Sequence, residues 1–187
     1  MTGQRVGTSN RLRLMGVVGV VTVLVMAGVW LAHGAASDDR ASDSSSSAAG
    51  VGHPAPDFSA TTIDGSALTL SSLRGQPVWL IFNATWCADC RAEAPDVQAL
   101  HASLAPDGLQ VVAVYLNEEA SVVREWTTLL GLTFIHVPDP DGSIASAYVV
   151  PGVPTHYFID ATGTVRSLQV GSLTRDAMAQ AVSGLGD

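Results

Sequence analysis

Two cysteines three positions apart are the residues of this sequence best suited to chemistry. Cys87 and Cys90 are the only cysteines in the chain. They follow an apolar run of strand length at 78–82 and open a segment at 88–104 that is predicted to be a helix. At this spacing two sulfur atoms can meet across the first helical turn, and the free N–H groups of a helix N-terminus favour thiolate over thiol. Cys87 is therefore the candidate nucleophile, and Cys90 the candidate resolving thiol, of a dithiol–disulfide exchange.

The same pair of cysteines allows uses other than redox exchange. A structural disulfide is one, and half of a zinc site is another. Zinc needs four ligands, and the five histidines of the chain are scattered, with none at a spacing that partners the cysteines. Haem attachment is disfavoured because Arg91 rather than His follows Cys90. We predict no metal and no cofactor, and keep a Cu(I)-binding module as the non-enzymatic alternative.

The elements that must position the cysteines alternate between strands and helices. Continuous apolar runs such as 78–82 and 109–116 are typical of strands covered on both faces. An Asp-Gly pair at 64–65 predicts a hairpin ahead of them. Strands are predicted at 58–62, 67–70, 78–82, 109–116, 133–137, 156–160 and 165–170, and helices at 88–104, 118–130, 144–148 and 174–183. This order predicts an α/β fold with a mixed central sheet between helices.

The predicted helix at 118–130 is amphipathic. Its apolar residues recur at helical spacing, and Gly131 is well placed to end it. Glu118 and Glu119 are predicted to form its acidic first turn. The inner face is predicted to consist of Val122, Val123, Trp126, Leu129 and Leu130.

The N-terminal 36 residues predict a membrane anchor. Residues 14–32 are an uninterrupted uncharged run, and as a helix this run is about 28 Å long, which just spans a bilayer core. Three arginines precede it, so the positive-inside rule places the N-terminus in the cytoplasm and the remaining chain outside. We predict a cytoplasmic tip and transmembrane anchor over 1–36. A cleaved signal peptide is the alternative, because small residues at 32–36 offer a cleavage site.

Composition separates the rest of the chain into a linker and one domain. Residues 37–50 are rich in Ser and Asp and predict a flexible linker, which leaves 51–187 as the globular domain. The 187 residues include 17 acidic and nine basic ones, all of them Arg, for a formal charge of −8. This balance excludes a nucleic-acid partner. A hydrophobic fraction of 47% with 14% charged residues excludes disorder of the whole chain.

Four segments in sequence order resemble one family. The globular part is similar to the membrane-anchored thioredoxin-like proteins of the TlpA/ResA/CcmG group, within the redoxin (AhpC/TSA) superfamily. The similar segments are the entry segment 51–58, the hairpin and short helix 64–77, the strand-to-helix stretch 83–95 and the loop 152–155. The resemblance covers nearly all of 51–187. It implies a thioredoxin-like three-layer fold with an extra N-terminal β-hairpin.

The resemblance also assigns the candidate site residues. It implies that Cys87 attacks first, that Cys90 resolves, and that the two form a redox-active disulfide. Pro154 is expected to be cis and to face this pair, with an ordinary trans proline as the alternative. The backbone of Val153 is then expected to align a substrate peptide as an added strand. Trp86 is expected to be a half-exposed platform beside the nucleophile.

Two further titratable residues lie close to the motifs. Glu93 matches an acidic position found in much of the group, and its spacing places it on the same helix face as Cys90. Its implied role is to tune the thiols or move a proton. The alternative is a surface carboxylate favoured by the helix dipole. His156 lies two residues past Pro154 and is predicted to be a hydrogen-bonded histidine of an edge strand, its approach to the site being the alternative.

Asp89 departs from the usual pattern of the group and bears on the direction of electron flow. A carboxylate between the two thiols disfavours thiolate by like-charge repulsion, which makes the reduced pair a better reductant. With the resemblance, this favours a disulfide reductase of exported proteins, such as in cytochrome c maturation. A thiol transporter of the membrane is the expected electron donor.

Other functions remain as alternatives to the reductase. A disulfide-forming oxidase uses the same two cysteines in the same order, so only the reduction potential separates it from a reductase. A thiol peroxidase is disfavoured because residues 83–86 lack the Pro that such sites place ahead of the cysteine.

Overall fold

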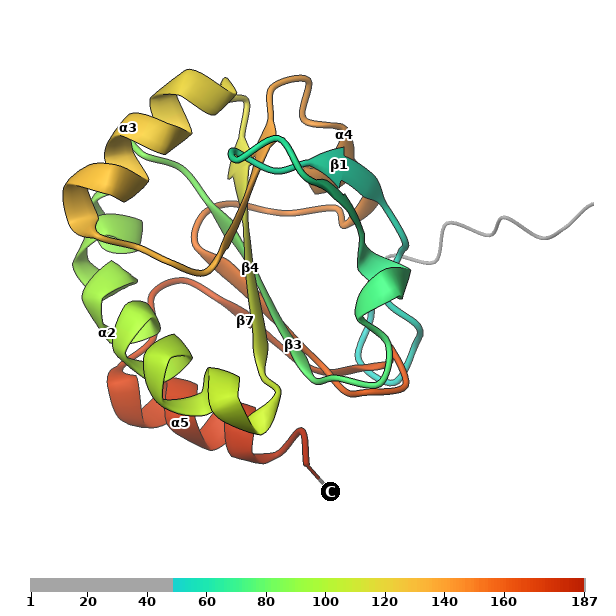
Figure 1. Cartoon of the computed structure of the whole chain (residues 1–187). Coiled ribbons are helices and arrows are strands. Elements are labelled where there is room, and N and C mark those ends of the chain that lie inside the picture. The colour runs from blue at the N-terminus through green and yellow to red at the C-terminus, as the bar shows by residue number, and fades with distance from the viewer. Residues whose placement is uncertain (1–48, 187) are drawn as a thin grey trace, which may run out of the picture. The chain divides into compact units, whose positions relative to one another are not determined.

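The computed structural model describes residues 49–186. Within them lie a two-stranded sheet and a five-stranded sheet of order β5-β4-β3-β6-β7 (Figure 1). The elements in chain order are β1 (Ser59–Thr61), β2 (Ala67–Thr69), the 3-10 helix η1 (Leu70–Leu73), β3 (Val78–Asn83), α2 (Ala88–Leu104), the 3-10 helix η2 (Ala105–Asp107), β4 (Gln110–Leu116), α3 (Ala120–Leu130), β5 (Ile135–Asp139), α4 (Ser143–Ala147), β6 (Thr155–Ile159), β7 (Val165–Val170) and α5 (Arg175–Ser183).

The central strand β3 organises the larger sheet. All six of its residues are buried, as its continuous apolar sequence predicts. It pairs parallel with β4 on one side and antiparallel with β6 on the other. Strand β6 in turn pairs with β7, so β6 is an interior strand. The predicted mixed sheet is confirmed.

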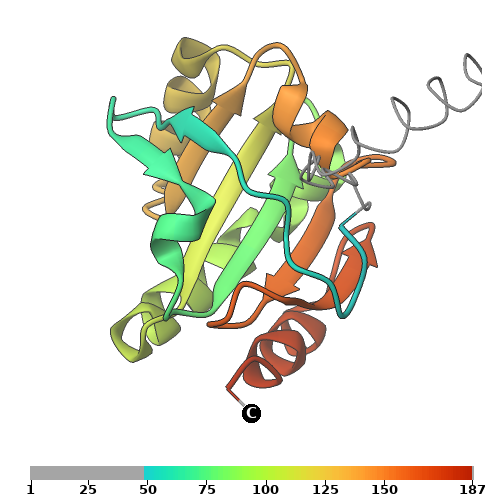
Figure 2. The same ribbon diagram turned by 90° about the vertical axis from the view of Figure 1, so that its right-hand side faces the viewer.

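Helices and the small hairpin cover the two faces of this sheet. Because side chains alternate along a strand, Trp79 and Ile81 of β3 pack into one core with residues of α2, α3 and α5. Leu80 and Phe82 pack into a second core on the other face, with residues of the hairpin, η1 and α4. Figures 1 and 2 show these layers on either side of the sheet. The thioredoxin-like three-layer fold with an extra N-terminal hairpin is confirmed.

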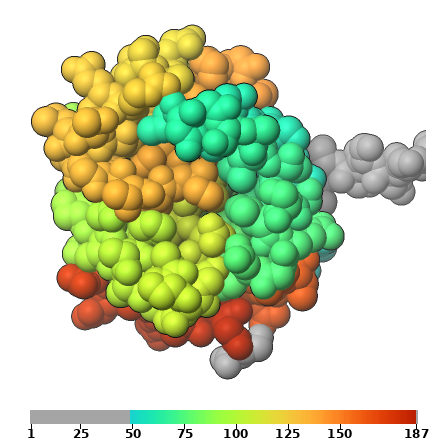
Figure 3. Space-filling view, viewed as in Figure 1, coloured from blue at the N-terminus to red at the C-terminus, as the bar shows by residue number. Residues whose placement is uncertain are grey.

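The hairpin is held against the edge of the sheet at β5. The backbone N–H of Ile63 donates to the carbonyl of His136 at 3.0 Å. The guanidinium of Arg124 on α3 donates to the Ile63 carbonyl in turn. In Figure 3 the teal hairpin lies directly beside the orange segment that leads into β5. The hairpin thereby covers a sheet edge that would otherwise offer unpaired backbone groups.

The inner face of α3 differs from the prediction. Val123, Trp126 and Thr127 are its buried residues, whereas Val122 is 45% and Leu129 81% exposed. At about 100° per residue the three buried side chains fall within one arc of roughly 100°. Trp126 marks one edge of this arc, and Val122 and Leu129 lie outside the arc on the same side. The prediction is confirmed for Val123 and Trp126. It is wrong for Val122 and Leu129 because the apolar stripe is wider than the surface against which the helix packs, and Leu130 is also exposed, at 36%.

Element boundaries agree closely with the sequence pattern. Helix α2 begins and ends where it was predicted, and the side chain of Thr174 caps α5 by accepting from the N–H of Ala177. The strand predicted at 133–137 lies two residues later in β5, because Pro138 and Asp139 also pair with β4.

The predictions for the N-terminus fall largely outside the described residues. This holds for the membrane anchor or signal peptide at 1–36 and for the linker at 37–50 except its last two residues. Between residues 49 and 186, no helix has the length and apolar character needed to cross a bilayer.

His136 is a buried titratable residue of the core. It lies on β5, 4% exposed, with its ring centroid 4.4 Å from that of Phe134. Its Nδ1 lies 3.0 Å from the Tyr115 hydroxyl. Burial disfavours the charged ring and lowers the pKa of His136 from 6.5 to about 4.

This pKa predicts a loss of stability in mild acid. Between pH 6.5 and 4 the unfolded chain binds a proton at His136 that the folded chain does not, so the stability present above pH 6.5 is lost as the pH falls. The loss amounts to about 3 kcal/mol. Urea unfolding of the full chain at several pH values should show a smaller loss for His136→Gln than for the natural protein. Exposed His53→Gln is the control, and equal losses in all three proteins would contradict the assignment.

Candidate active site

The cysteine pair lies at the junction of β3 and α2. Cys87 is the N-cap residue of α2, and its sulfur accepts a hydrogen bond from the backbone N–H of Cys90 at 3.1 Å. The two residues form a disulfide across Cα atoms 5.3 Å apart, a usual separation for this bond. The predicted pairing is confirmed. An N–H group at the start of a helix favours thiolate over thiol, so the same position would stabilise the Cys87 thiolate once the disulfide is reduced.

The two sulfur atoms differ in accessibility. Cys87 is 7% exposed, and Cys90 is 1% exposed beneath it. Ala84 and Val153 pack around the pair. Trp86, immediately before the outer cysteine, is 70% exposed and is a more open surface than predicted. Both cysteines are thus largely covered, and Cys87 is the one nearer to the surface that a partner protein meets.

The loop ahead of β6 faces the pair. The Val153–Pro154 peptide bond is cis, as expected. The carbonyl oxygen of Val153 lies 3.8 Å from the sulfur of Cys87. Gly171 donates its N–H to the Pro154 carbonyl, which fixes the loop to the end of β7. The Val153 N–H has no partner within residues 49–186, and this leaves it free to pair with an extended peptide.

The chain enters this loop through a strained residue. Val149 follows α4 with φ of +52° and is 65% exposed. Its N–H bonds to the Ser146 carbonyl, and the N–H of Val150 bonds to the Ala145 carbonyl. This is the left-handed helix ending at which Gly is usual. Gly131 makes the same ending at α3, with φ of +64°.

The turn between β3 and α2 is held by a buried carboxylate. Thr85 donates its backbone N–H and its hydroxyl to Glu118, at 2.9 and 2.5 Å, and Glu118 is 8% exposed. The prediction of Glu118 in the first turn of a helix was wrong, because α3 begins at Ala120 with Glu119 as its N-cap. Sequence spacing gives no signal for this contact, since it joins residues 33 positions apart. Its effect is to fix the approach to Cys87.

Glu93 points into the protein rather than into solvent. It is 5% exposed, so the alternative of a surface carboxylate is wrong. One carboxylate oxygen, Oε2, accepts the backbone N–H of Leu173 at 3.2 Å. The other, Oε1, lies 3.5 Å from Nε2 of His156. Glu93 follows Cys90 by three residues on α2, so both residues lie on the same face of the helix.

His156 is the residue whose position was mispredicted most. It is fully buried on β6, an interior strand, and is not an edge histidine. Its Nδ1 accepts a hydrogen bond from the indole N–H of Trp79 at 3.3 Å. The signal available in the sequence was its period-two spacing from Pro154, which puts both side chains on one face of the strand.

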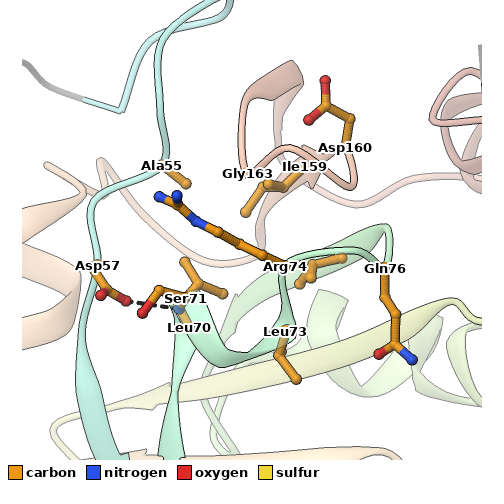
Figure 4. A pocket seen from close by; sticks show the side chains of 11 residues that line it. Ala55, Asp57, Leu70, Ser71, Leu73, Arg74, Gln76, Ile159, Asp160 and Gly163 are labelled. Carbon is orange, nitrogen blue, oxygen red and sulfur yellow. Dashed lines mark hydrogen bonds between the residues drawn. The ribbon is translucent and has the colours of Figure 1, made fainter.

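The hollow drawn in Figure 4 lies at the start of β3, at the end of the strand opposite to the cysteines. The side chain of Arg74 passes Gly163 there, and Asp57 accepts the N–H of Ser71 at 2.9 Å. Its volume is about 20 Å³, room for about one water. Six strand residues separate it from the turn before Cys87, about 20 Å. It takes no part in the chemistry of the thiols.

Known proteins share both the fold and the cysteine chemistry. Thiol-disulfide oxidoreductase ResA of Oceanobacillus iheyensis is 37% identical over 132 residues, covering 68% of this chain and 69% of the relative. Thioredoxin-like protein YneN of Bacillus subtilis is 39% identical over 132 residues, covering 69% of this chain and 76% of the relative. A secreted disulfide oxidoreductase of Mycobacterium tuberculosis superposes with a TM-score of 0.62 at 28% identity. The match covers 68% of this chain and 96% of that structure. Fold, cysteine pair and relatives together define a thioredoxin-like enzyme of the thiol–disulfide oxidoreductase class.

The family follows from a match to most of the domain. The AhpC/TSA family model matches residues 51–168, more than half of the chain, so the protein belongs to the AhpC/TSA family. The resemblance inferred from the four sequence segments is thereby confirmed.

The backbone strain at Val149 yields a prediction on stability. Val149→Gly should raise the free energy of unfolding by about 1 kcal/mol, because glycine relieves the left-handed strain and the exposed valine loses little packing. Gly131→Val should lower it by a similar amount. No atom lies within 4 Å of a Cβ built at Gly131, so that cost is strain alone. Thermal unfolding checks both variants, and a Val149→Gly protein less stable than the natural one would contradict the argument.

Proposed function

We propose that this protein is a disulfide reductase of exported proteins, acting outside the cytoplasmic membrane. The observation that carries the proposal is the position of Cys87 at the capped N-terminus of α2, more exposed than Cys90 and 3.8 Å from the Val153 carbonyl. This arrangement gives a nucleophile nearer to the surface than the resolving thiol, and a backbone edge for a client peptide.

The reaction consists of two exchanges. In the reduced enzyme the Cys87 thiolate attacks one sulfur of a client disulfide, and the other client sulfur leaves as a thiolate that takes up a proton. The product is a mixed disulfide between Cys87 and the client. The Cys90 thiol then loses its proton and attacks the sulfur of Cys87, which releases the second client sulfur. The client gains two electrons, and the enzyme is left as the Cys87–Cys90 disulfide.

Glu93 is proposed as the group that handles the proton of Cys90. Cys90 is 1% exposed, so water has poor access to its thiol when the mixed disulfide must be resolved. Glu93 lies one helical turn further along α2 and is itself buried. A carboxylate there can accept the proton as Cys90 attacks and return it in the reverse direction.

The charges around the pair support the reductive direction. Asp89 lies in the first turn of α2, and the carboxylates of Glu93 and Glu118 are close to the same turn. The nearest cation on the helix, Arg91, donates to the Thr85 carbonyl. Negative charge near the sulfurs opposes the thiolate and stabilises the disulfide relative to the dithiol, which lowers the reduction potential.

The proposed location and partners rest on the sequence and the relatives. The apolar run within 1–36 supports a single-pass anchor with the N-terminus in the cytoplasm, a linker at 37–50 and an exported domain from 51 onward. A signal peptide at the same place would release the domain instead. Oxidised Cys87–Cys90 then requires a membrane dithiol donor, such as a thiol transporter, for each new cycle. Apocytochrome c is one client class with disulfides to reduce.

The first prediction concerns trapping of the client. Cys90→Ala should accumulate a mixed disulfide through Cys87 with exported proteins, because the resolving thiol is gone. Cys87→Ala should accumulate little, since Cys90 is buried. Non-reducing electrophoresis of the full-length proteins, followed by mass spectrometry, checks this. Absence of any adduct with Cys90→Ala would contradict the exchange and favour the Cu(I)-binding alternative.

The second prediction concerns direction. The full-length protein, equilibrated against dithiothreitol or glutathione and followed by Trp fluorescence, should show a reduction potential near or below about −230 mV. A value of about −120 to −180 mV would establish the oxidase instead. Asp89→Asn should raise the potential by about 10 mV. Asp96→Asn, further along α2 beside Arg175, is the matched control and should leave it unchanged.

A further inference from the structure

Two buried polar atoms beside the active-site helix face each other without any other partner. Oε1 of Glu93 and Nε2 of His156 are 3.5 Å apart, and their side chains are 3% and 0% exposed. Within residues 49–186 neither atom has a hydrogen-bond partner, and their own separation of 3.5 Å is longer than a normal hydrogen bond. Leaving such groups unpaired costs free energy, so their mutual approach calls for an explanation.

Trp79 determines which atom of the His156 ring carries the proton. An indole N–H is a donor only, and it points at Nδ1 of His156. Nδ1 must therefore be the acceptor, and a neutral ring then carries its proton on Nε2. A doubly protonated ring would place a second donor against the indole. With Nδ1 as the acceptor, the N–H on Nε2 is directed at Glu93.

The ring is well fixed in this orientation. The indole of Trp79 packs beside the imidazole with centroids 6.0 Å apart, and Phe158 stacks on both rings. Strand β6 is bonded on both sides. The imidazole therefore cannot turn without disturbing the core between β3, β6 and α2.

We infer that His156 is a positioning residue for Glu93. Its Nε2 lies 3.5 Å from Oε1 in the disulfide form and closes to a hydrogen bond in the reacting state, while the N–H of Leu173 holds Oε2. The two donors come from β6 and from the segment before α5, so the carboxylate is fixed from two elements beyond its own helix. Hydrogen bonds of catalytic groups are often long in one resting state and shorten in the reacting state. The 3.5 Å separation between Oε1 of Glu93 and Nε2 of His156 belongs to the resting state in which Cys87 and Cys90 form a disulfide.

His156 orients the carboxylate and does not relay its proton. The ring is 0% exposed, and its other nitrogen ends on the indole of Trp79, which has no proton path onward. The proton that Glu93 takes from Cys90 leaves on the side of the thiols, to the client thiolate released from Cys87, and not through His156. This inference rests on the proposed role of Glu93 in exchange, and it adds the residue that makes that role efficient.

The test separates the two exchange steps. Reduced full-length protein is mixed with oxidised glutathione, quenched in acid at intervals, and analysed by mass spectrometry for the Cys87–glutathione adduct and the Cys87–Cys90 disulfide. His156→Leu should leave formation of the adduct unchanged and slow its resolution about tenfold, part of the factor that a general acid–base group contributes. His156→Gln should restore resolution, because its amide N–H reaches the place of Nε2.

Two further variants show that the effect passes through Glu93. Glu93→Gln should also slow resolution, and the double variant Glu93→Gln/His156→Leu should be no slower than Glu93→Gln alone. His136→Leu is the matched control, since His136 is a similarly buried strand histidine that bonds to Tyr115 instead. It should leave the ratio of the two rates unchanged.

A spectroscopic measurement tests the orientation without activity. Nitrogen NMR of the imidazoles, with His156→Gln to assign the signal, should show the Nε2–H tautomer at His156 near neutral pH. Trp79→Phe keeps the ring packing and removes the indole donor, so it should allow the other tautomer.

The outcomes distinguish this inference from the function on which it rests. If His156→Leu resolves the glutathione adduct at the rate of the natural protein while Glu93→Gln resolves it slowly, the inference about His156 fails but the proposed function stands. The inference also fails if NMR shows the proton of His156 on Nδ1, or on both ring nitrogens. Fast resolution in Glu93→Gln overturns the role of Glu93 and that of His156 with it. A natural protein that forms no glutathione adduct overturns the proposed exchange itself.

Discussion

The rest of the site depends on the hydrogen bond that caps α2 with the sulfur of Cys87. A capping atom must sit where the helix begins, and the helix begins here because β3, buried on both faces, ends at Asn83 and is followed by a short turn. Glu118 holds that turn through Thr85. The reactive sulfur is thus positioned by a strand, a helix end and a buried carboxylate, none of which depends on a client being present.

Buried polar groups gather on the inner side of the cysteines, and apolar surface on the outer side. Glu93 and His156 are enclosed between α2 and β6, where a low dielectric makes a fixed carboxylate effective. Trp86, by contrast, is 70% exposed beside Cys87. This division agrees with the proposed exchange, in which a partner meets the surface at Trp86 and Cys87 while Glu93 takes the proton of Cys90 out of contact with solvent.

Some stability is given up around the client-facing loop. Val149 holds a left-handed conformation that valine tolerates poorly, at the start of the segment that leads to Pro154. Elsewhere the chain places Gly at the same kind of helix ending, as at Gly131. Strain kept in the loop that faces the thiols, and avoided at α3, agrees with a general tendency of functional sites to store it.

The sequence alone determined the fold class, the helix that begins after Cys87 and the cysteine pair, because each depends on local patterns: apolar periodicity, a cap position, a four-residue motif. The loop with Pro154 was expected only from the resemblance to a family. Tertiary structure decided what those patterns cannot express. His156 is interior because β7 pairs beyond β6, Glu118 bonds to Thr85 across 33 positions, and the packed arc of α3 is narrower than its apolar stripe. Each of these depends on which distant segments meet, and periodicity along one segment carries no information about its neighbours in space.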